Sequence, residues 1–261
     1  MSKRIRTYSL FLITIGLILM LAFVTPVFSQ DSGSDEEMVA RGAYLTQVAG
    51  CITCHTNYLP QYLDFENISL EDIQTIALFE RNSLNTDEAL LAGGRVFDLG
   101  PGGVIVTRNL TPDEATGLGA WTDEEIIAAI SQGKSHDGRD LHPIMPSAHY
   151  NNMALSDLQS IVAYLRSIPA VENEIAAPDA LIPPRDLPPV DESKEVPDSE
   201  DAAANGEYLM RGVLPCTDCH TPIDFETGAP MFDLFLGGGQ TFEGPWGIVY
   251  GGNITPDEET G

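Results

Sequence analysis

The sequence predicts a mainly α protein made of two tandem, small helical domains with long irregular loops, joined by a linker rich in proline and acidic residues. The chain of 261 residues contains an internal repeat, its first copy holds apolar residues at helical spacing, and no strand-like alternation of any length appears. The expected boundaries are 34–170 for the first domain, 171–199 for the linker and 200–261 for the second, incomplete domain.

The repeat is visible in three stretches. RGAYLTQVAGCITCH at 41–55 returns as NGEYLMRGVLPCTDCH at 205–220, GGRVF at 93 returns as GGQTF at 238, and RNLTPDEATG at 108 returns as GNITPDEETG at 252. The first copy carries an insertion containing ISLEDIQTIALFER, for which we expect an amphipathic helix. It also continues past Gly117, whereas the second copy stops at Gly261, so we interpret the sequence as a fragment of a longer product.

The N-terminus predicts export. Residues 1–30 combine a basic start, an apolar run over 10–24 and a small residue at Ser29, which is the pattern of a signal peptide. Because the apolar run is nearly long enough to span a membrane, retention as an N-terminal anchor is the alternative. Export would place the protein in the periplasm or at the outer face of the cytoplasmic membrane, with membrane association if the segment is retained.

The charge balance limits the possible partners. The 13 Lys and Arg against 39 Asp and Glu give a formal net charge of −26, which would repel a phosphate backbone and excludes nucleic acid as a partner. The same charge favours a redox partner with a basic docking patch and a salt-dependent association. A solvated acidic surface that only maintains solubility is the alternative.

Helix starts are marked by capping boxes. They pair Ser34 with Glu37, Thr122 with Glu125, and Ser156 with Gln159. The run after the last one has an apolar stripe of Leu158, Ile161, Val162 and Leu165 and stops before Pro169. The Gly- and Pro-rich stretch 93–106 is expected to form an irregular loop, and 171–199 an extended, semi-rigid spacer.

All four cysteines lie in two CxxCH motifs. Two thiols at this spacing reach the two vinyl groups of haem, and the following histidine is carried to the iron by the same turn. Cys51, Cys54 and His55 are therefore expected to hold one covalently bound haem c, and Cys216, Cys219 and His220 a second. A four-thiolate zinc site would make the first copy depend on the second, and a disulfide within each pair would leave both histidines unexplained.

The stretch TRNLTPDEATGLGAWTDEEIIAAISQGKSHDGRDLHPIMPSAHYNNMALSDLQSIVAYLRSIP resembles the dihaem and trihaem cytochrome c subunits of membrane-bound alcohol and sugar dehydrogenases. The resemblance covers the first copy from about 40 to 169 and the second as far as it extends. It implies cytochrome c-like domains, and it implies that Met145 in HPIMPSAHY is the sixth iron ligand. Dehydrogenase or oxidase subunits are the partners considered, and the resemblance favours the dehydrogenase.

Chemistry also favours Met145. A thioether opposite imidazole raises the reduction potential and closes the iron to substrates, and Pro143 and Pro146 stiffen the loop. Met153 is the competitor expected in the core. A bis-histidine site through His142 or His149 is the lower-potential alternative, disfavoured because exposed loop histidines are usually unliganded, and His136 is expected in a solvent-facing turn.

Several residues are candidates for the surroundings of the haem. Trp121 either packs between helices or donates its indole N–H to a haem propionate. Asn109 and Asn253 either stabilise their loops through Asx turns or contact a propionate. Each proximal histidine is expected to donate its second ring N–H to a carbonyl, with those of Pro101 and Pro245 as candidates.

The predicted function is the transfer of single electrons outside the cytoplasm, from a donor that is either a dehydrogenase or quinol-linked to a respiratory acceptor, by a protein that is not itself an enzyme. No phosphate loop, nucleophile elbow or second metal cluster is present in the sequence. The main alternative is a dihaem peroxidase-like oxidoreductase with one open iron. A redox sensor is a third possibility, for which no signalling domain is present.

Overall fold

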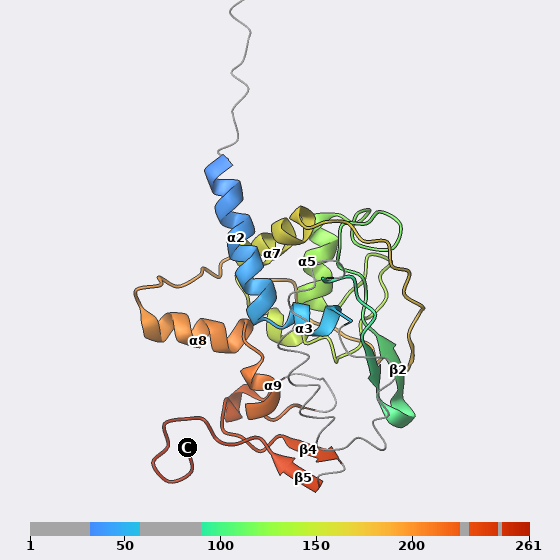
Figure 1. Cartoon of the computed structure of the whole chain (residues 1–261). Helices are drawn as coiled ribbons and strands as arrows, with labels where there is room; N and C mark the ends of the chain where they lie inside the picture. The colour runs from blue at the N-terminus through green and yellow to red at the C-terminus, as the bar shows by residue number, and fades with distance from the viewer. Residues whose placement is uncertain (1–31, 58–89, 225–229, 245–246) are drawn as a thin grey trace, which may run out of the picture. The chain divides into compact units, whose positions relative to one another are not determined.

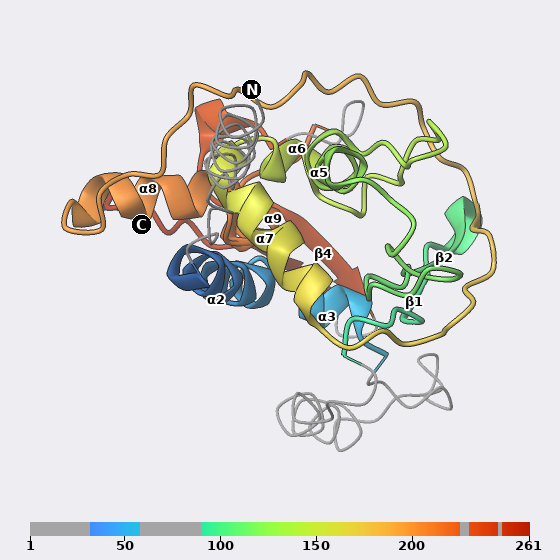
Figure 2. The ribbon, with the colours of Figure 1, turned by 90° about the horizontal axis from the view of Figure 1, so that it is seen from above.

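The computed structural model describes residues 32–57, 90–224, 230–244 and 247–261. The contacts below lie within the compact unit Glu36–Gly261. Helices dominate this unit and strands are few and short, as the sequence predicts for a mainly α cytochrome fold. Figure 1 shows α2, α7 and α5 beside one another, and Figure 2 shows the same arrangement from above.

Two helices bring the first CxxCH motif into position. Helix α2 (Ser32–Val48) ends just before Gly50, whose φ of 80° turns the chain into the short helix α3 (Cys51–His55). Gly42 on α2 lies against α7 (Leu155–Ser167) so closely that a Cβ there would lie 1.8 Å from the carbonyl oxygen of Ser160. A glycine is therefore required where these two helices cross.

The predicted cap of the next helix is confirmed. Helix α5 (Asp123–Gln132) begins with a complete capping box between Thr122 and Glu125, and it ends at Gly133, which has a φ of 66°. The other two boxes are wrong as helix starts. Helix α2 begins at Ser32, before Ser34, and α7 has Ala154 as its N-cap, which places Ser156 inside the first turn.

Helix α7 confirms the predicted apolar stripe. Leu158, Ile161, Val162 and Leu165 are buried, and the helix ends at Ser167, before Pro169. Tyr164 is half-buried and packs against the same core. Met153, at the approach to α7, is fully buried in this core, as expected from the sequence.

The stretch 93–106 is not an irregular loop, contrary to the prediction. Strands β1 (Val96–Asp98) and β2 (Gly103–Val106) pair antiparallel around the short 3-10 helix η2 (Gly100–Gly102), and β3 (Asp179–Ala180) adds to the other edge of β2. Gly103 makes this possible, because its φ is 98° and a Cβ would lie 2.2 Å from the carbonyl oxygen of Asp179. Strands this short leave little alternation to detect.

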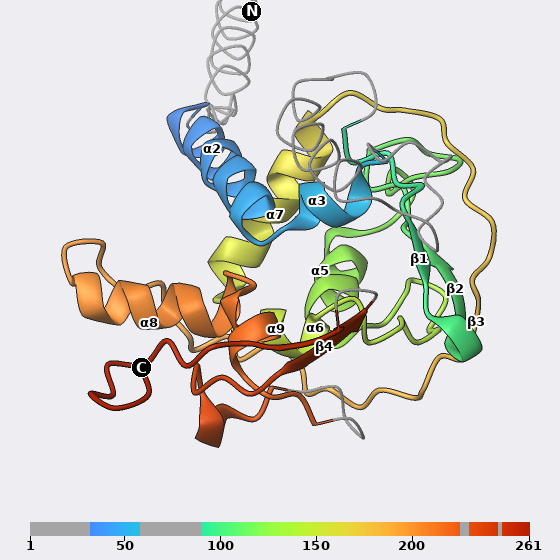
Figure 3. The same cartoon turned by 60° about the horizontal axis from the view of Figure 1, so that its bottom comes forward.

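The second copy begins with α8 (Ala202–Gly212) and α9 (Cys216–His220), followed by the 3-10 helix η3 (Phe232–Leu234) and the hairpin of β4 (Thr241–Gly244) and β5 (Gly247–Tyr250). Tyr208 of α8 donates its hydroxyl to Asp157 of α7 at 2.7 Å. Asp157 also forms a two-pronged ion pair with Arg41 at 2.8 and 2.9 Å. This network joins the two copies, and Figure 3 shows helices α7 and α8, which carry two of its members.

A second contact between the copies involves His149 of the short helix α6 (Ser147–Tyr150). The expectation of an exposed loop histidine is wrong, because His149 is 1% exposed and its Nδ1 lies 3.1 Å from Oγ1 of Thr217 in α9. Among the described residues, its Nε2 has no hydrogen-bond partner. Burial therefore lowers the pKa of His149 to about 4.

This burial predicts a loss of stability in mild acid. The unfolded chain takes up a proton at His149 near pH 6.5, while the folded protein does so only near pH 4, so stability falls as the pH drops between these values. The full loss is on the order of 3 kcal/mol in the free energy of unfolding. Urea unfolding across this pH range would measure it.

Comparing the wild type with His149→Gln isolates the contribution of His149. All other groups titrate in both proteins, so their contributions to the pH dependence cancel in the difference. We expect the variant to lack this component of the pH dependence, and His136→Gln, at an exposed histidine, to retain it. Equal pH slopes in wild type and His149→Gln would show that burial of His149 does not set the acid sensitivity.

Two predictions lie outside the described residues. They are the N-terminal signal or anchor at 1–30 and the amphipathic helix in the insertion. Within the part of the chain that is described, no helix has the length and apolar character needed to cross a membrane.

Candidate cofactor site

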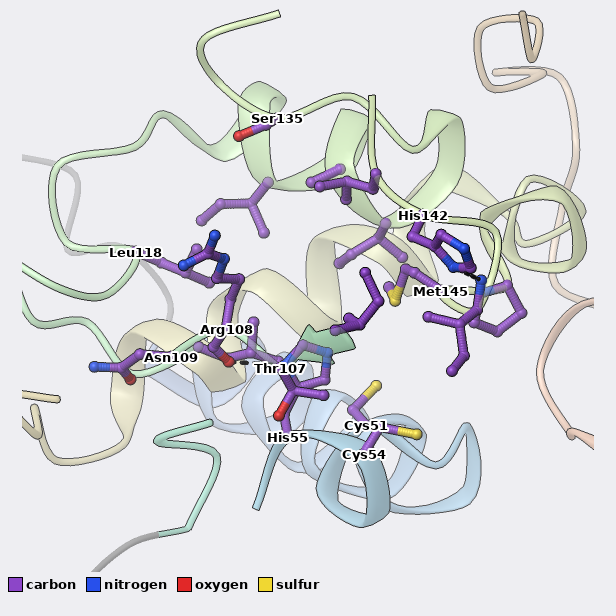
Figure 4. A pocket seen from close by; sticks show the side chains of 18 of the residues that line it. Cys51, Cys54, His55, Thr107, Arg108, Asn109, Leu118, Ser135, His142 and Met145 are labelled. Atoms are coloured by element: carbon purple, nitrogen blue, oxygen red, sulfur yellow. Dashed lines mark hydrogen bonds between the residues drawn. The ribbon is translucent and has the colours of Figure 1, made fainter. Parts of the chain in front are cut away.

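The residues of the first motif face a cavity of about 590 Å³. Helix α3 brings Cys51, Cys54 and His55 to its wall, and none of the four cysteines of the chain is joined in a disulfide. Figure 4 shows the two sulfur atoms on one side of this space and the Met145 side chain on the other. Burial, with a smaller contribution from the neighbouring Cys54, raises the pKa of Cys51 to about 12, which keeps this thiol protonated at neutral pH.

His55 has the tautomer of a metal ligand. Its Nδ1 lies 2.8 Å from the carbonyl oxygen of Arg108, and because a carbonyl can only accept, Nδ1 carries the hydrogen. Burial lowers the pKa of His55, and the neutral ring keeps the lone pair of Nε2 free. The predicted partner Pro101 is wrong, because the recurrence of a GP turn does not determine which carbonyl the chain path brings to the histidine.

The turn around Asn109 explains why Arg108 provides that carbonyl. Oδ1 of Asn109 accepts from N–H and Oγ1 of Thr111 at 2.9 and 2.8 Å, while Nδ2 donates to Val171 and Thr116 at 2.7 and 3.1 Å. The side chain is 2% exposed and forms the Asx turn that was one of its two predicted roles. Because both ends of the amide are bonded, the preceding carbonyl is held toward His55.

Met145 reaches the cavity from the loop between α5 and α6. Its backbone N–H donates to the carbonyl of His142 at 2.9 Å, which forms a tight turn before Pro146. Of the competitors, only His142 also lines the cavity, whereas Met153 and His149 do not. Nδ1 of His142 accepts from N–H of Ile144 at 3.1 Å, so in the neutral ring the hydrogen is on Nε2, which leaves no lone pair for iron. Burial first, and then the charge of Arg185, lower the pKa of His142.

One end of the cavity is cationic, a feature that was not predicted from the sequence. Arg108 and Arg139 both line it, and the pKa of Arg108 is lowered by burial first and then by the charge of Arg139. Trp121 lines the same cavity and packs its ring against that of His136, with ring centroids 4.4 Å apart. His136 is exposed in its turn, as expected. The sequence signal that could have predicted this cationic end is the presence of Arg108 and Arg139 in the stretch that resembles cytochrome c subunits.

The second copy repeats the local geometry. Nδ1 of His220 lies 2.7 Å from the carbonyl oxygen of Gly252, the counterpart of Arg108, so the predicted partner Pro245, which lies outside the described residues, is wrong. Asn253 accepts from N–H and Oγ1 of Thr255 at 2.9 and 2.7 Å, as Asn109 does from Thr111. Gly252 has no side chain, so the second copy lacks the cation that Arg108 provides in the first.

The second motif also contributes to the first cavity. Pro215, directly before the second motif, and Asp218, within it, line the cavity together with Cys54. Burial raises the pKa of Asp218 to about 6, and its charge contributes to the raised pKa of Cys54 after the larger effect of burial. The two CxxCH helices therefore lie close together.

The donor set fits a haem. The free Nε2 of His55, two thiols on the same helix and a thioether from another wall meet at one apolar space, whose volume falls within the range of cofactor pockets of about 300–1,000 Å³. Its apolar wall is formed by Phe97, Ile105, Ile126, Ile130, Leu141, Ile161 and Leu165. The arginines at one end suit the two carboxylates of haem.

No family model matches the chain, but similar proteins are known. One of the subunits of the nicotinate dehydrogenase of Pseudomonas putida is 31% identical over 64% of this chain and 15% of its own length. The cytochrome c subunit of the alcohol dehydrogenase (quinone) of Gluconacetobacter polyoxogenes is 27% identical over 81% of this chain and 42% of its own length. The fructose dehydrogenase cytochrome subunit of Gluconobacter japonicus is 28% identical over 85% of this chain and 41% of its own length.

This chain thus spans less than half the length of these relatives. Its homologues are cytochrome c subunits of alcohol, fructose and gluconate dehydrogenases and a dihaem cytochrome c, at 24–31% identity over most of the chain. The resemblance inferred from the sequence is therefore confirmed.

Proposed function

We propose, starting from this homology to cytochrome c subunits, that the chain is an exported dihaem c-type cytochrome that carries single electrons from a dehydrogenase to a respiratory acceptor. The observation that carries the proposal is the joint placement of Cys51, Cys54, His55 and Met145 around one cavity. The recurrence of the histidine–carbonyl bond at His220 supports a second haem of the same kind.

The proposed roles follow from the contacts. Cys51 and Cys54 would attach the first haem, His55 and Met145 would hold its iron, and Cys216, Cys219 and His220 would hold the second. When bound, haem c supplies an iron that gains or loses one electron at a time. His55 is oriented by the Arg108 carbonyl, and the apolar wall excludes water. Arg108 and Arg139 would neutralise the propionates, with Trp121 beside them.

The proposed organisation consists of two cytochrome c domains at 34–170 and 200–261, with 171–199 between them. The periplasm or the outer face of the cytoplasmic membrane is the proposed location, because residues 1–30 have the pattern of an export signal or anchor. A basic docking patch on the partner would suit the net charge of −26. The names of the relatives favour a dehydrogenase as the partner.

Haem counting, redox titration and carbon monoxide binding on the exported protein test this proposal together. A pyridine haemochrome spectrum is expected to give two covalent haems per chain, both of high potential and unreactive toward carbon monoxide. A variant with all four cysteines changed to Ala is the negative control, because it cannot attach haem covalently. One carbon monoxide-binding haem would instead indicate an open iron and the peroxidase-like alternative, and no covalent haem would overturn the proposal.

A further inference from the structure

The segment that follows the first copy lies along its cavity instead of forming a free spacer. The carbonyls of Val171 and Ile175 accept from Asn109 and Arg108 at 2.7 and 2.6 Å. Farther along, Pro178 and Ile182 line the cavity, and β3 pairs with β2. Figure 3 shows the segment as an extended trace that passes the hairpin of β1 and β2 before it reaches α8. This stretch is therefore a wall of the first site.

Arg185 is the most deeply placed charge of this segment. It is 6% exposed, and its Nη1 donates to the backbone carbonyl of Met145 at 2.9 Å. Its guanidinium occupies the space beside Gly133, where a Cβ would lie 3.1 Å from Nη1. In the described part of the chain, Nε and Nη2 have no hydrogen-bond partner.

Such burial is costly. A guanidinium taken out of water with two of its nitrogens, Nε and Nη2, unpaired destabilises the fold, and burial accordingly lowers the pKa of Arg185. The hydrogen bond from Nη1 goes to the loop that delivers the Met145 thioether. The backbone of Arg185 is also anchored, because its N–H donates to the carboxylate of Asp140. This hydrogen bond, after the larger effect of the one from Lys134, keeps the pKa of Asp140 below its usual value.

We propose that Arg185 is a positioning residue for the first haem. Its hydrogen bond to the Met145 carbonyl holds the backbone of the loop at 142–146, so that the thioether of Met145 stays directed into the cavity that His55 faces. This inference rests on the proposed role of Met145 as an axial ligand. A purely structural Arg185 would affect stability without affecting the iron.

The test compares Arg185→Met with Lys194→Met. Lys194 comes from the same segment and also donates to a backbone carbonyl, that of Asn152 at 2.9 Å, which is away from the Met145 loop. Losing the charged hydrogen bond should populate the open loop roughly tenfold more in Arg185→Met. We expect a similar gain in carbon monoxide association with the reduced protein and a lower potential for one haem. Lys194→Met should match wild type, and Arg185→Lys, which keeps a cationic donor, should recover most of the wild-type behaviour.

The outcomes separate the inference from the function. If Arg185→Met loses only stability while its carbon monoxide reactivity and potential stay at wild-type values, Arg185 does not position the ligand. If Met145→Ala also leaves both readouts unchanged, the proposed ligand itself is wrong. Should Arg185→Met not fold, Arg185→Gln provides the same comparison, because its amide ends near the position of Nε and is too short to make the Nη1 bond to the Met145 carbonyl.

Discussion

Cys54→Ala is expected to yield a protein that carries haem at the second motif alone, so its covalent haem content should fall to about half that of the wild type. Cys54 lies on α3 and lines the first cavity, where its thiol is one of two proposed attachment points. Alanine is the best helix former, so α3 itself should persist. The second motif keeps Cys216, Cys219 and His220 unchanged.

Haem staining after denaturing electrophoresis and the mass of the peptide containing 51–55 would measure this loss. Thr53→Ala is the matched control, because it changes the exposed residue next to Cys54 within the same helix and should keep both haems. Cys219→Ala should give the mirror result, with haem on the first motif. A Cys54→Ala protein that still carries two covalent haems would refute the attachment scheme.

The same samples discriminate against the other uses of cysteine. A disulfide within each pair predicts no free thiol and no haem in the wild type, and a four-thiolate zinc site predicts about one zinc per chain. Loss of a single cysteine would then abolish zinc binding in both copies together. Haem loss confined to one motif is expected only if each copy holds its own cofactor.

Local patterns predicted the parts of the molecule that depend on local chemistry. The capping box at Thr122 located the start of α5, and the stripe from Leu158 to Leu165 identified the buried face of α7. Each of these signals lies within one or two helical turns.

Contacts between distant segments were not predictable in this way. The β1–β2 hairpin depends on Gly103, where the backbone of β3 approaches closely, and composition alone suggested a loop. The partner of His55 depends on the Asx turn of Asn109. Arg185 meets Met145 across 40 residues, and His149 meets Thr217 across 68, so neither contact leaves a periodic trace in the sequence.

Met145→Ala is expected to leave both haems attached while it opens the first iron. The thioether bonds are untouched, and the Arg185 hydrogen bond goes to the backbone carbonyl of Met145, which the substitution keeps. The reduced variant should therefore bind more carbon monoxide than the wild type does. Because axial ligands span about 0.8 V of potential, we expect one haem to fall by on the order of 0.1 V or more.

Met153→Leu is the matched control. Met153 is fully buried and lies outside the cavity, so this volume-conserving change should cost less than about 1.5 kcal/mol of stability and leave carbon monoxide binding unchanged. A gain in carbon monoxide binding limited to Met145→Ala would therefore reflect the loss of a ligand, not a general loosening of the core.

One compensating outcome needs its own variant. His142 lines the same cavity, and if it replaced the missing thioether, the potential would fall without a gain in carbon monoxide binding. Its Nδ1 accepts from Ile144, so ligation through Nε2 would require the ring to release that hydrogen bond or its proton. Met145→Ala combined with His142→Gln removes this route. If the double variant still excluded carbon monoxide, neither residue would be the sixth ligand, because the two groups most suited to the iron from this loop would both be gone.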